Sequence, residues 1–362
     1  RMKKTILALT MLLSAGACIM AQHQEINRNN EVQYHFFTNN IPSEWNYPLI
    51  GFVNNVNGNH ESIQIGIVNN TTGNFGGVQA GFINSVGGRV TGFQSGFINA
   101  VNDDFAGIQS GFINSTAADF KGIQSGFINS NGNKNVGVQG GFINSSEQVF
   151  GVQTGFINAS GKGVTGLQCG FINSTGNMTG LQYGFINSAK TLNGLQLGFI
   201  NSVDNIENGL PIGFLSFVKH GGFKAIEVSY NEINPFNIAF KTGIREFYTY
   251  PVLAYDWRKT DDRFSFGYGI GSNFDISSLF FINPEIEGMH QVSLDFNHYS
   301  TLRCNVGFNL GNHMEILAGP SLVWNFKINA ADFHQDYTEW DPSIIAVNKV
   351  TAGFNVAARY KF

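Results

Sequence analysis

The sequence predicts an all-β chain: a β-solenoid built from a 14–15-residue repeat, followed by an antiparallel β-barrel of eight to ten strands. Two patterns support this prediction. One short unit recurs at nearly constant spacing through the first half of the chain, as expected of a repeat architecture. The C-terminal part instead alternates apolar and polar residues over segments of about ten residues, which is typical of barrel strands.

The composition excludes several classes of protein. Only 13% of the 362 residues are charged, which is about half the share in a typical soluble domain. The net charge is -4 and the pI about 6.1, so we expect no basic surface that holds a nucleic acid. Aromatic residues make up 14% of the chain, which is too many for a disordered protein. Glycine and uncharged amides supply most of the polarity.

Residues 1–21 have the pattern of a secretion signal peptide. A short basic start precedes an apolar stretch, and Ala21 is the expected cleavage point. A membrane anchor, or a lipoprotein attached through Cys18, is the alternative for this segment. Cleavage leaves an N-terminal lead-in over 22–48 and too few cysteines for a disulfide framework. We therefore expect an exported protein, located in the outer membrane or at the cell surface of a Gram-negative bacterium.

Residues 49–217 repeat one unit, Gly-(Val/Ile/Leu/Phe)-Gln-x-Gly-Phe-Ile-Asn-(Ser/Ala), twelve times at a spacing of 14 or 15 residues. The first and last units depart from this pattern, as capping repeats do. The recurring glutamines are Gln64, Gln79, Gln94, Gln109, Gln124, Gln139, Gln153, Gln168, Gln182 and Gln196. The recurring asparagines are Asn54, Asn69, Asn84, Asn99, Asn114, Asn129, Asn144, Asn158, Asn173, Asn187 and Asn201.

Two geometries fit these units. In a β-solenoid each unit is one coil, and equivalent side chains stack at about 4.8 Å, so the amides form hydrogen-bonded ladders. In an antiparallel meander each unit is one strand, and most identical positions do not face each other. The solenoid explains why an amide holds its place in nearly every unit. A bend at the glycine would turn the adjacent Phe and Ile both inward. Every charge of the array lies in a spacer, so we expect wet spacers and a buried or stacked motif.

Residues 218–362 predict the barrel, because charge density rises and strict alternation begins. Lipid would contact the apolar side of each strand, and the lumen would hold the charges. Only a closed barrel leaves no unpaired edge in hydrocarbon. A soluble β-sandwich with one buried face is the alternative. The candidate strands lie near 223–230, 236–244, 246–256, 263–272, 277–286, 290–297, 301–310, 314–326 and 349–362. In the last of them, the apolar face consists of Phe354, Val356, Ala358, Tyr360 and Phe362.

Two family resemblances follow from these motifs. The closing segment 352–362 resembles the last strand of bacterial outer-membrane β-barrel proteins, in which a C-terminal aromatic residue is part of the signal read by the assembly machinery. By that resemblance Phe362 is a membrane-assembly signal, and outer-membrane lipid is the partner of the barrel. The Gly-x-Gln-x-Gly-x-x-Asn unit resembles bacterial surface-repeat proteins of the leptospiral type, which implies a surface location more than any activity.

The sequence offers little chemistry. Its eight histidines are scattered, and none has the spacing to a cysteine or carboxylate that a metal site requires. Cys169 occupies a variable repeat position, and Asp103 and Asp104 form part of a solvated spacer. The motif carries none of the clustered carboxylates that polysaccharide-cleaving enzymes need. We therefore expect no enzyme, no cofactor and no metal.

The function expected from the sequence is that of a cell-envelope protein with a structural or adhesive role. Aligned spacers would offer multivalent contact to a glycan or protein ligand. The alternative is an outer-membrane channel for small solutes, with the repeats acting as strands of one large antiparallel barrel. Membrane barrels alternate short turns with long loops, whereas the spacers here are nearly equal in length, which favours the solenoid.

Overall fold

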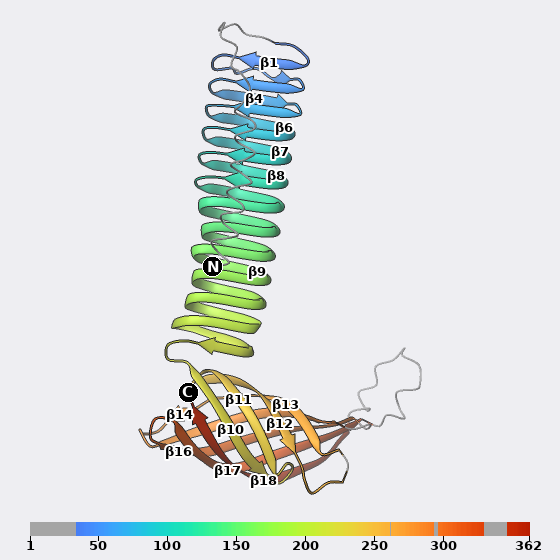
Figure 1. Cartoon of the computed structure of the whole chain (residues 1–362), viewed down its shortest axis with the longest axis vertical. Helices are drawn as coiled ribbons and strands as arrows, with labels where there is room; N and C mark the ends of the chain where they lie inside the picture. Colours follow the sequence, from blue (N-terminus) through green and yellow to red (C-terminus); the bar gives the residue numbers. More distant parts are fainter. Residues whose placement is uncertain (1–33, 261, 293–295, 329–345) are drawn as a thin grey trace. The chain divides into compact units, whose positions relative to one another are not determined.

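The computed structural model describes residues 34–260, 262–292, 296–328 and 346–362. Every regular element in these ranges is a β-strand, which confirms the all-β prediction (Figure 1). Contacts divide the chain into two compact units, one built on the repeats and the other, from Leu210 to Phe362 with Gly198–Ile206, built on the barrel. The predicted signal peptide lies outside the described residues.

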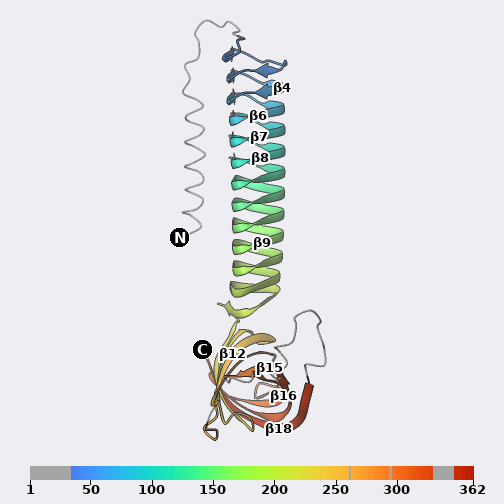
Figure 2. The ribbon, with the colours of Figure 1, turned by 90° about the vertical axis from the view of Figure 1, so that its right-hand side faces the viewer.

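The compact unit built from the repeats is a parallel β-solenoid, as predicted. Consecutive strands pair in parallel with a shift of one whole repeat, so that Gln79 lies beside Gln94 and Asn84 beside Asn99. Figure 2 shows the resulting stack of coils from the side. Its strands are β1 (Thr38–Ile41), β2 (Leu49–Ile50), β3 (Val53–Val56), β4 (His60–Ile65), β5 (Val68–Thr71), β6 (Phe75–Val86), β7 (Val90–Val101), β8 (Phe105–Thr116) and β9 (Phe120–Val218).

The parallel register overturns the meander and the single large barrel for these residues. An antiparallel arrangement would bring unlike positions together, whereas here each amide meets its own copy in the next coil. The array also begins earlier than predicted. Asn39 in β1 pairs with Asn54 in β3, so the segment 22–48 contributes strand to a first coil.

The solenoid core combines the two buried amides of each motif with apolar residues that flank the spacers. Among the latter, Phe75, Val90, Phe105 and Phe120 occupy one column and are almost fully buried. The expectation of wholly wet spacers is therefore wrong at their borders. A coil needs an apolar side chain there because the motif places only amides and small Ser or Ala side chains inside.

The second unit contains a closed antiparallel barrel of eight strands, within the predicted range. Neighbouring strands in sequence pair with each other, β10 pairs with β18, and β13 pairs with β15, so no barrel strand keeps a free edge. The short strand β14 (Phe274–Asp275) adds to β15 at one end. The barrel strands are β10 (Phe223–Asn231), β11 (Phe236–Ile244), β12 (Phe247–Tyr255), β13 (Phe264–Gly271), β15 (Phe280–Gln291), β16 (Phe296–Leu310), β17 (Met314–Ile328) and β18 (Ala346–Lys361).

The eight strands agree with the predicted range of eight to ten, but the boundaries of two candidate segments were wrong. The candidates 277–286 and 290–297 divide a stretch that is one strand, β15, and β16 then begins at Phe296. Glu287 and Gly288 fall in the gap between these two candidates, and Glu285 lies just before it. In the structure both carboxylates point into the barrel and find cationic partners there, so the strand continues through them.

The barrel is polar inside and apolar outside. Along β18, Asn355 and Arg359 are buried, whereas Val356 and Tyr360 are more than two-fifths exposed on the outer face. The same alternation appears on the other strands, where the exposed outer residues include Ile226, Val228, Leu253, Phe266, Ile286, Val306 and Ile316. A β-sandwich with a single buried apolar face is therefore excluded, because the apolar face is the outer one.

Candidate functional site

The glutamines of the motif form one continuous ladder inside the solenoid. In each coil the Gln Nε2 donates to Oε1 of the preceding glutamine, with nine successive bonds of 2.6–2.9 Å from Gln79 to Gln196. All ten side chains are fully buried. A buried amide is costly unless its donors and acceptors are paired, and stacking identical coils supplies the pairs.

The asparagines form a second ladder with the opposite polarity. Each Nδ2 donates to Oδ1 of the following asparagine at 2.7–2.9 Å, from Asn39 as far as Asn187. The second N–H reaches a backbone carbonyl of the next coil, for example Asn84 Nδ2 to Ser95 O at 2.8 Å. The asparagine bond has the same length whether the two residues are 14 or 15 positions apart, because the shorter repeats have one residue fewer in the spacer.

The glycines of the motif make the close approach of coils possible. Gly107 has a φ of 137°, and a Cβ there would lie 1.9 Å from the carbonyl oxygen of Gly92. A Cβ on the second glycine, as at Gly111, would lie 2.5 Å from Nδ2 of Asn99. The first glycine is therefore needed for backbone conformation, and the second for room beside the asparagine ladder.

The ladders end where the sequence loses the amide. Leu49 takes the glutamine position in the coil before Gln64. Gln196 Oε1 has no hydrogen-bond partner among the described atoms, and the next repeat carries Pro211 at this position. In the second unit, Asn201 Nδ2 donates to the Ser216 hydroxyl at 3.3 Å. These substitutions are the degenerate units that the sequence identified as caps.

His60 is an unusual member of the N-terminal coils. It occupies the core column of Phe75 and is fully buried. Its Nδ1 lies 2.6 Å from Trp45 O, and its Nε2 has no partner among the described atoms. Burial lowers the pKa of His60 below its ordinary value, so the ring is neutral near pH 7.

The motif phenylalanines face outward, which corrects the expectation that Phe and Ile both turn inward. From Phe82 to Phe185 neighbouring rings stack at 4.9–5.0 Å between centroids with interplanar angles of 1–3°. Each ring remains about two-fifths exposed or more. We call this row, Phe82 to Phe185, the phenylalanine stripe. The glycine bend sends asparagine rather than phenylalanine into the core, because the ladder fills the interior.

The barrel lumen holds a dense network of buried charges. Lys241 Nζ contacts Glu227 Oε2 at 2.8 Å and also pairs with Glu285. Arg359 joins Glu227 at 2.8 Å, Glu285 at 3.4 Å and Glu315 at 3.1 Å. All of these side chains are at most 3% exposed. Several opposite charges share each partner, which offsets the cost of removing them from water.

Tyrosine and further charges complete this lumen network. Tyr248 donates to Glu285 at 2.5 Å, and Tyr250 donates to the same carboxylate at 3.2 Å. Arg303 forms a buried pair with Glu287. The lumen is thus filled by side chains that hold one another.

The end of the barrel where β18 finishes carries a cleft and the predicted signal residue. The cleft has a volume of about 740 Å³, and its lining includes Lys224, Arg245, Asp275, Lys361 and Phe362. The Phe362 backbone N–H donates to Lys224 O at 3.1 Å, and its ring is 66% exposed. The terminal aromatic is therefore fixed in the sheet through its backbone while its ring faces outward.

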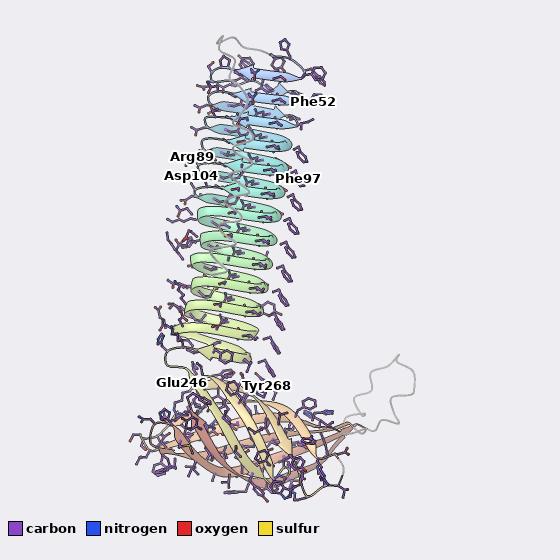
Figure 3. All side chains as sticks on the ribbon, in the orientation of Figure 1. Phe52, Arg89, Phe97, Asp104, Glu246 and Tyr268 are labelled. Atoms are coloured by element: carbon purple, nitrogen blue, oxygen red, sulfur yellow. The ribbon has the colours of Figure 1, made fainter. Side chains whose placement is uncertain are left out.

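The remaining candidate groups from the sequence lie apart from one another in the described parts of the chain. No three His, Cys, Asp or Glu side chains group as a metal ion would require among these residues. Cys169 and Cys304 are free thiols in separate units. Asp103 and Asp104 lie in an exposed spacer, where Asp104 pairs with Arg89 at 3.2 Å (Figure 3). In the ranges that the structure covers, no helix is long and apolar enough to span a membrane.

The structure brings together the predicted ladder residues and adds others that sequence reasoning missed. Asn39 joins the asparagine ladder although its coil lacks the motif glycine and glutamine. Glu227, Lys241, Glu285 and Glu287 join the lumen network. Each occupies the inward phase of an alternating strand, so isolated charges in that phase were the available signal.

Comparison with known proteins finds no relative. No protein-family model matches the chain, and no curated protein or solved structure is significantly similar to it. The two family resemblances therefore rest on the motifs alone.

Proposed function

We propose that this chain is a non-enzymatic bacterial cell-envelope protein whose barrel lies in the outer membrane and whose solenoid has a structural or adhesive role. The observation that carries the proposal is the inverted polarity of the barrel. Side chains such as Leu253 and Val306 are 61% and 56% exposed on the outside, while charges are buried inside. Water would disfavour that outer face, whereas hydrocarbon suits it.

The solenoid supports a structural role. Its amides are paired along the whole stack, so successive coils are held by the same contacts and the array is stiff. Its charges are confined to the spacers, and none of the described residues forms an acid–base or nucleophile arrangement. A spacer, or a scaffold that presents its surface to other envelope components, uses these properties directly.

The filled lumen disfavours the channel alternative. Arg359, Glu285 and Lys241 cross the interior and are fully or almost fully buried. A small eight-stranded barrel has an interior that side chains can fill. Passage of a solute would require these paired charges to separate in a medium of low dielectric, which is costly.

The connections favour the periplasmic side for the array. At the end of the barrel that receives the chain from β9, hairpins of two and three residues join β11 to β12 and β16 to β17, and a longer connection of eight residues, which includes β14, joins β13 to β15. At the other end of the barrel, β17 ends at Ile328 and β18 begins at Ala346, so the longest stretch of sequence between two barrel strands separates them there. Outer-membrane barrels have short periplasmic turns and longer extracellular loops. We therefore favour a periplasmic spacer or envelope-binding role over adhesion to a host.

Thiol labelling with a membrane-impermeant maleimide tests the membrane proposal. Native Cys304 is exposed on the outer barrel face, two residues from Leu302 and from Val306. Cys304 should stay unlabelled in native membranes. It should react once the membranes are dissolved in detergent and the protein is denatured in urea. The accessible control is the Thr260→Cys variant in a C304S background. Residue 260 lies at the end of the barrel away from the entry of the chain from β9. Rapid labelling of Cys304 in native membranes would contradict a lipid-facing barrel.

The side of the membrane is tested with the same reagent. Ser125→Cys places an exposed thiol on the solenoid, in a background with Cys169 and Cys304 replaced by serine. We expect labelling of Thr260→Cys in intact cells, and of Ser125→Cys only after the outer membrane is permeabilised. Labelling of Ser125→Cys in intact cells would place the array outside and restore the adhesin alternative.

A further inference from the structure

The phenylalanine stripe is a continuous apolar feature of the solenoid surface. Eight rings from Phe82 to Phe185 follow one column, and those from Phe97 onward are each 42–43% exposed. Since a phenylalanine carries about 200 Å² of surface, the stripe presents on the order of 700 Å² of aromatic area. The largest apolar patch on a typical monomer is about 300–600 Å² and is often functional.

The stacking geometry limits what the stripe can bind. Adjacent rings are nearly parallel, with interplanar angles of 1–3°, so each ring covers the face of its neighbour. Only ring edges reach the surface. A sugar stacks on the open face of an aromatic ring, and such faces are occupied here by other rings. The stripe therefore does not suit a glycan, although the spacers do not share this restriction.

We propose that the phenylalanine stripe is the contact surface between two copies of this chain. The area matches the requirement, because a standard protein interface buries about 800 Å² per partner. The repeat matches as well, since a second copy has the same ring spacing and stays in register over every coil. Other repeating ligands would slip out of phase along the stack. No charged residue occupies the motif, so identical stripes meet without repulsion.

The orientation of the pair rests on the proposed function. Two chains anchored in one membrane run in the same direction, so a two-fold axis parallel to the solenoids brings each residue of the stripe against its own copy. The ionic column that contains Arg89 and Asp104 lies on the edge opposite Phe97 (Figure 3). Backbone bonds from Asp119 and Lys134 to the preceding aspartates continue this column, which would face away from the partner.

Cysteine cross-linking in native membranes tests this pairing. In a full-length background with Cys169 and Cys304 replaced by serine, Phe142→Cys places a thiol in the stripe. Lys134→Cys places one in the opposite column as the matched control. With a short bismaleimide we expect a covalent dimer from Phe142→Cys and at least a tenfold smaller yield from Lys134→Cys. Equal yields from the two variants, or no dimer from Phe142→Cys, would overturn the proposal.

A second measurement separates this inference from the membrane proposal. In detergent solution, the triple variant F97Q/F127Q/F156Q should reduce the dimer fraction at least tenfold by light scattering. The matched variant I108Q/I123Q/V138Q changes residues that are 40–47% exposed in another column and should leave the dimer intact. A monomeric wild type that still fractionates with membranes would reject the dimer alone. A stable dimer found in the soluble fraction of cells would reject the membrane anchor and the derived orientation.

Discussion

Gln124 donates a hydrogen bond of 2.8 Å from its Nε2 to Oε1 of Gln109, the same position one coil earlier. The asparagine ladder donates the other way, as Asn114 does to Asn129 in the next coil at 2.9 Å. Bonds within one ladder polarise each other in the same sense. Because the two ladders point in opposite directions, their dipoles oppose each other along the array. Each coil therefore gains directional bonding without a growing axial field.

The glutamine ladder is predicted to be essential in the interior of the array. Gln124→Leu keeps a side chain of similar volume but leaves Gln109 Oε1 buried without its hydrogen-bond donor. An unpaired buried group costs about 1–3 kcal/mol, so the local opening free energy around these coils should fall by about 2 kcal/mol. Hydrogen exchange measured by mass spectrometry reports that opening. Ser125→Leu, at the exposed neighbour, should have little effect, and equal effects of the two variants would refute the ladder's role.

Adjacent glycines offer a matched test of the close coil contact. Gly77 has a φ of 123°, and a Cβ would lie 2.2 Å from Ser62 O. The nearest atom to a Cβ on Gly76 is 3.5 Å away, at Glu61 Cγ. Gly77→Ala should destabilise these coils by about 2 kcal/mol or more, since strain and a backbone clash add together. Gly76→Ala should be nearly neutral in a urea titration. A neutral Gly77→Ala would show that the coils can move apart.

His60 is predicted to make the N-terminal coils sensitive to acid. Its lowered pKa means that the unfolded state binds a proton more readily than the folded state. Stability should therefore be full above about pH 6.5, the ordinary histidine pKa, and decline as the pH falls below it. His60→Phe, which copies the Phe75 position, should remove this decline. The measurement is the urea midpoint of the N-terminal coils at pH 8 and at pH 5, for the wild type and for His60→Phe. A hydrogen-exchange pulse at one fixed pH reports the unfolded fraction in every sample.

Lys241 is predicted to stabilise the barrel by neutralising two buried carboxylates. Lys241→Met leaves Glu227 and Glu285 with fewer cationic partners, and breaking a buried pair costs about 3–5 kcal/mol. Denaturant unfolding from lipid vesicles should show that loss. The double variant K241M/E227Q should recover part of it, because it removes a carboxylate that keeps Arg359 as its cationic partner but has lost Lys241. If the double variant were less stable than Lys241→Met, Glu227 would stabilise the barrel through contacts other than its pair with Lys241.

Phe362 is predicted to matter for assembly more than for stability. Its ring is 66% exposed, so Phe362→Ser should leave refolding into vesicles nearly unchanged. If the residue is read by the assembly machinery, the same variant should lower the amount of barrel in cell membranes several-fold. Phe354→Ser removes another outward aromatic of β18 and controls for lost lipid contact. Equal losses for both variants in cells would contradict a specific terminal signal.

Much of the architecture could be predicted because repetition constrains geometry. Gln64 to Gln196 recur at a spacing that only stacked coils convert into a ladder, and strict alternation around Arg359 indicates a strand with one polar face. The direction of the phenylalanine could not be deduced in the same way. A strand that bends at glycine loses the simple period of two, so adjacent residues no longer have assigned faces.

The missed features share another physical cause, which is that long-range partners override local preference. Glu287 and Gly288 fall between two predicted strands, whereas in the structure Arg303 of the next strand pairs with Glu285 and Glu287 and β15 continues through them. Asn39 lies in a segment without the motif, yet it meets Asn54 because the coil above provides the ladder. Pairings of this kind depend on residues that are distant in sequence, and a single strand does not reveal them.

Between the capping coils, the backbone and amide contacts from one coil to the next are the same, and this has a consequence for how the protein can evolve. An in-frame duplication or deletion of one unit leaves both new neighbours with partners that fit. The array would then lengthen or shorten in steps of about 4.8 Å per unit, with the barrel untouched. Recombination between near-identical gene segments can therefore change the length of the solenoid. We expect strains to differ in that length by whole repeats.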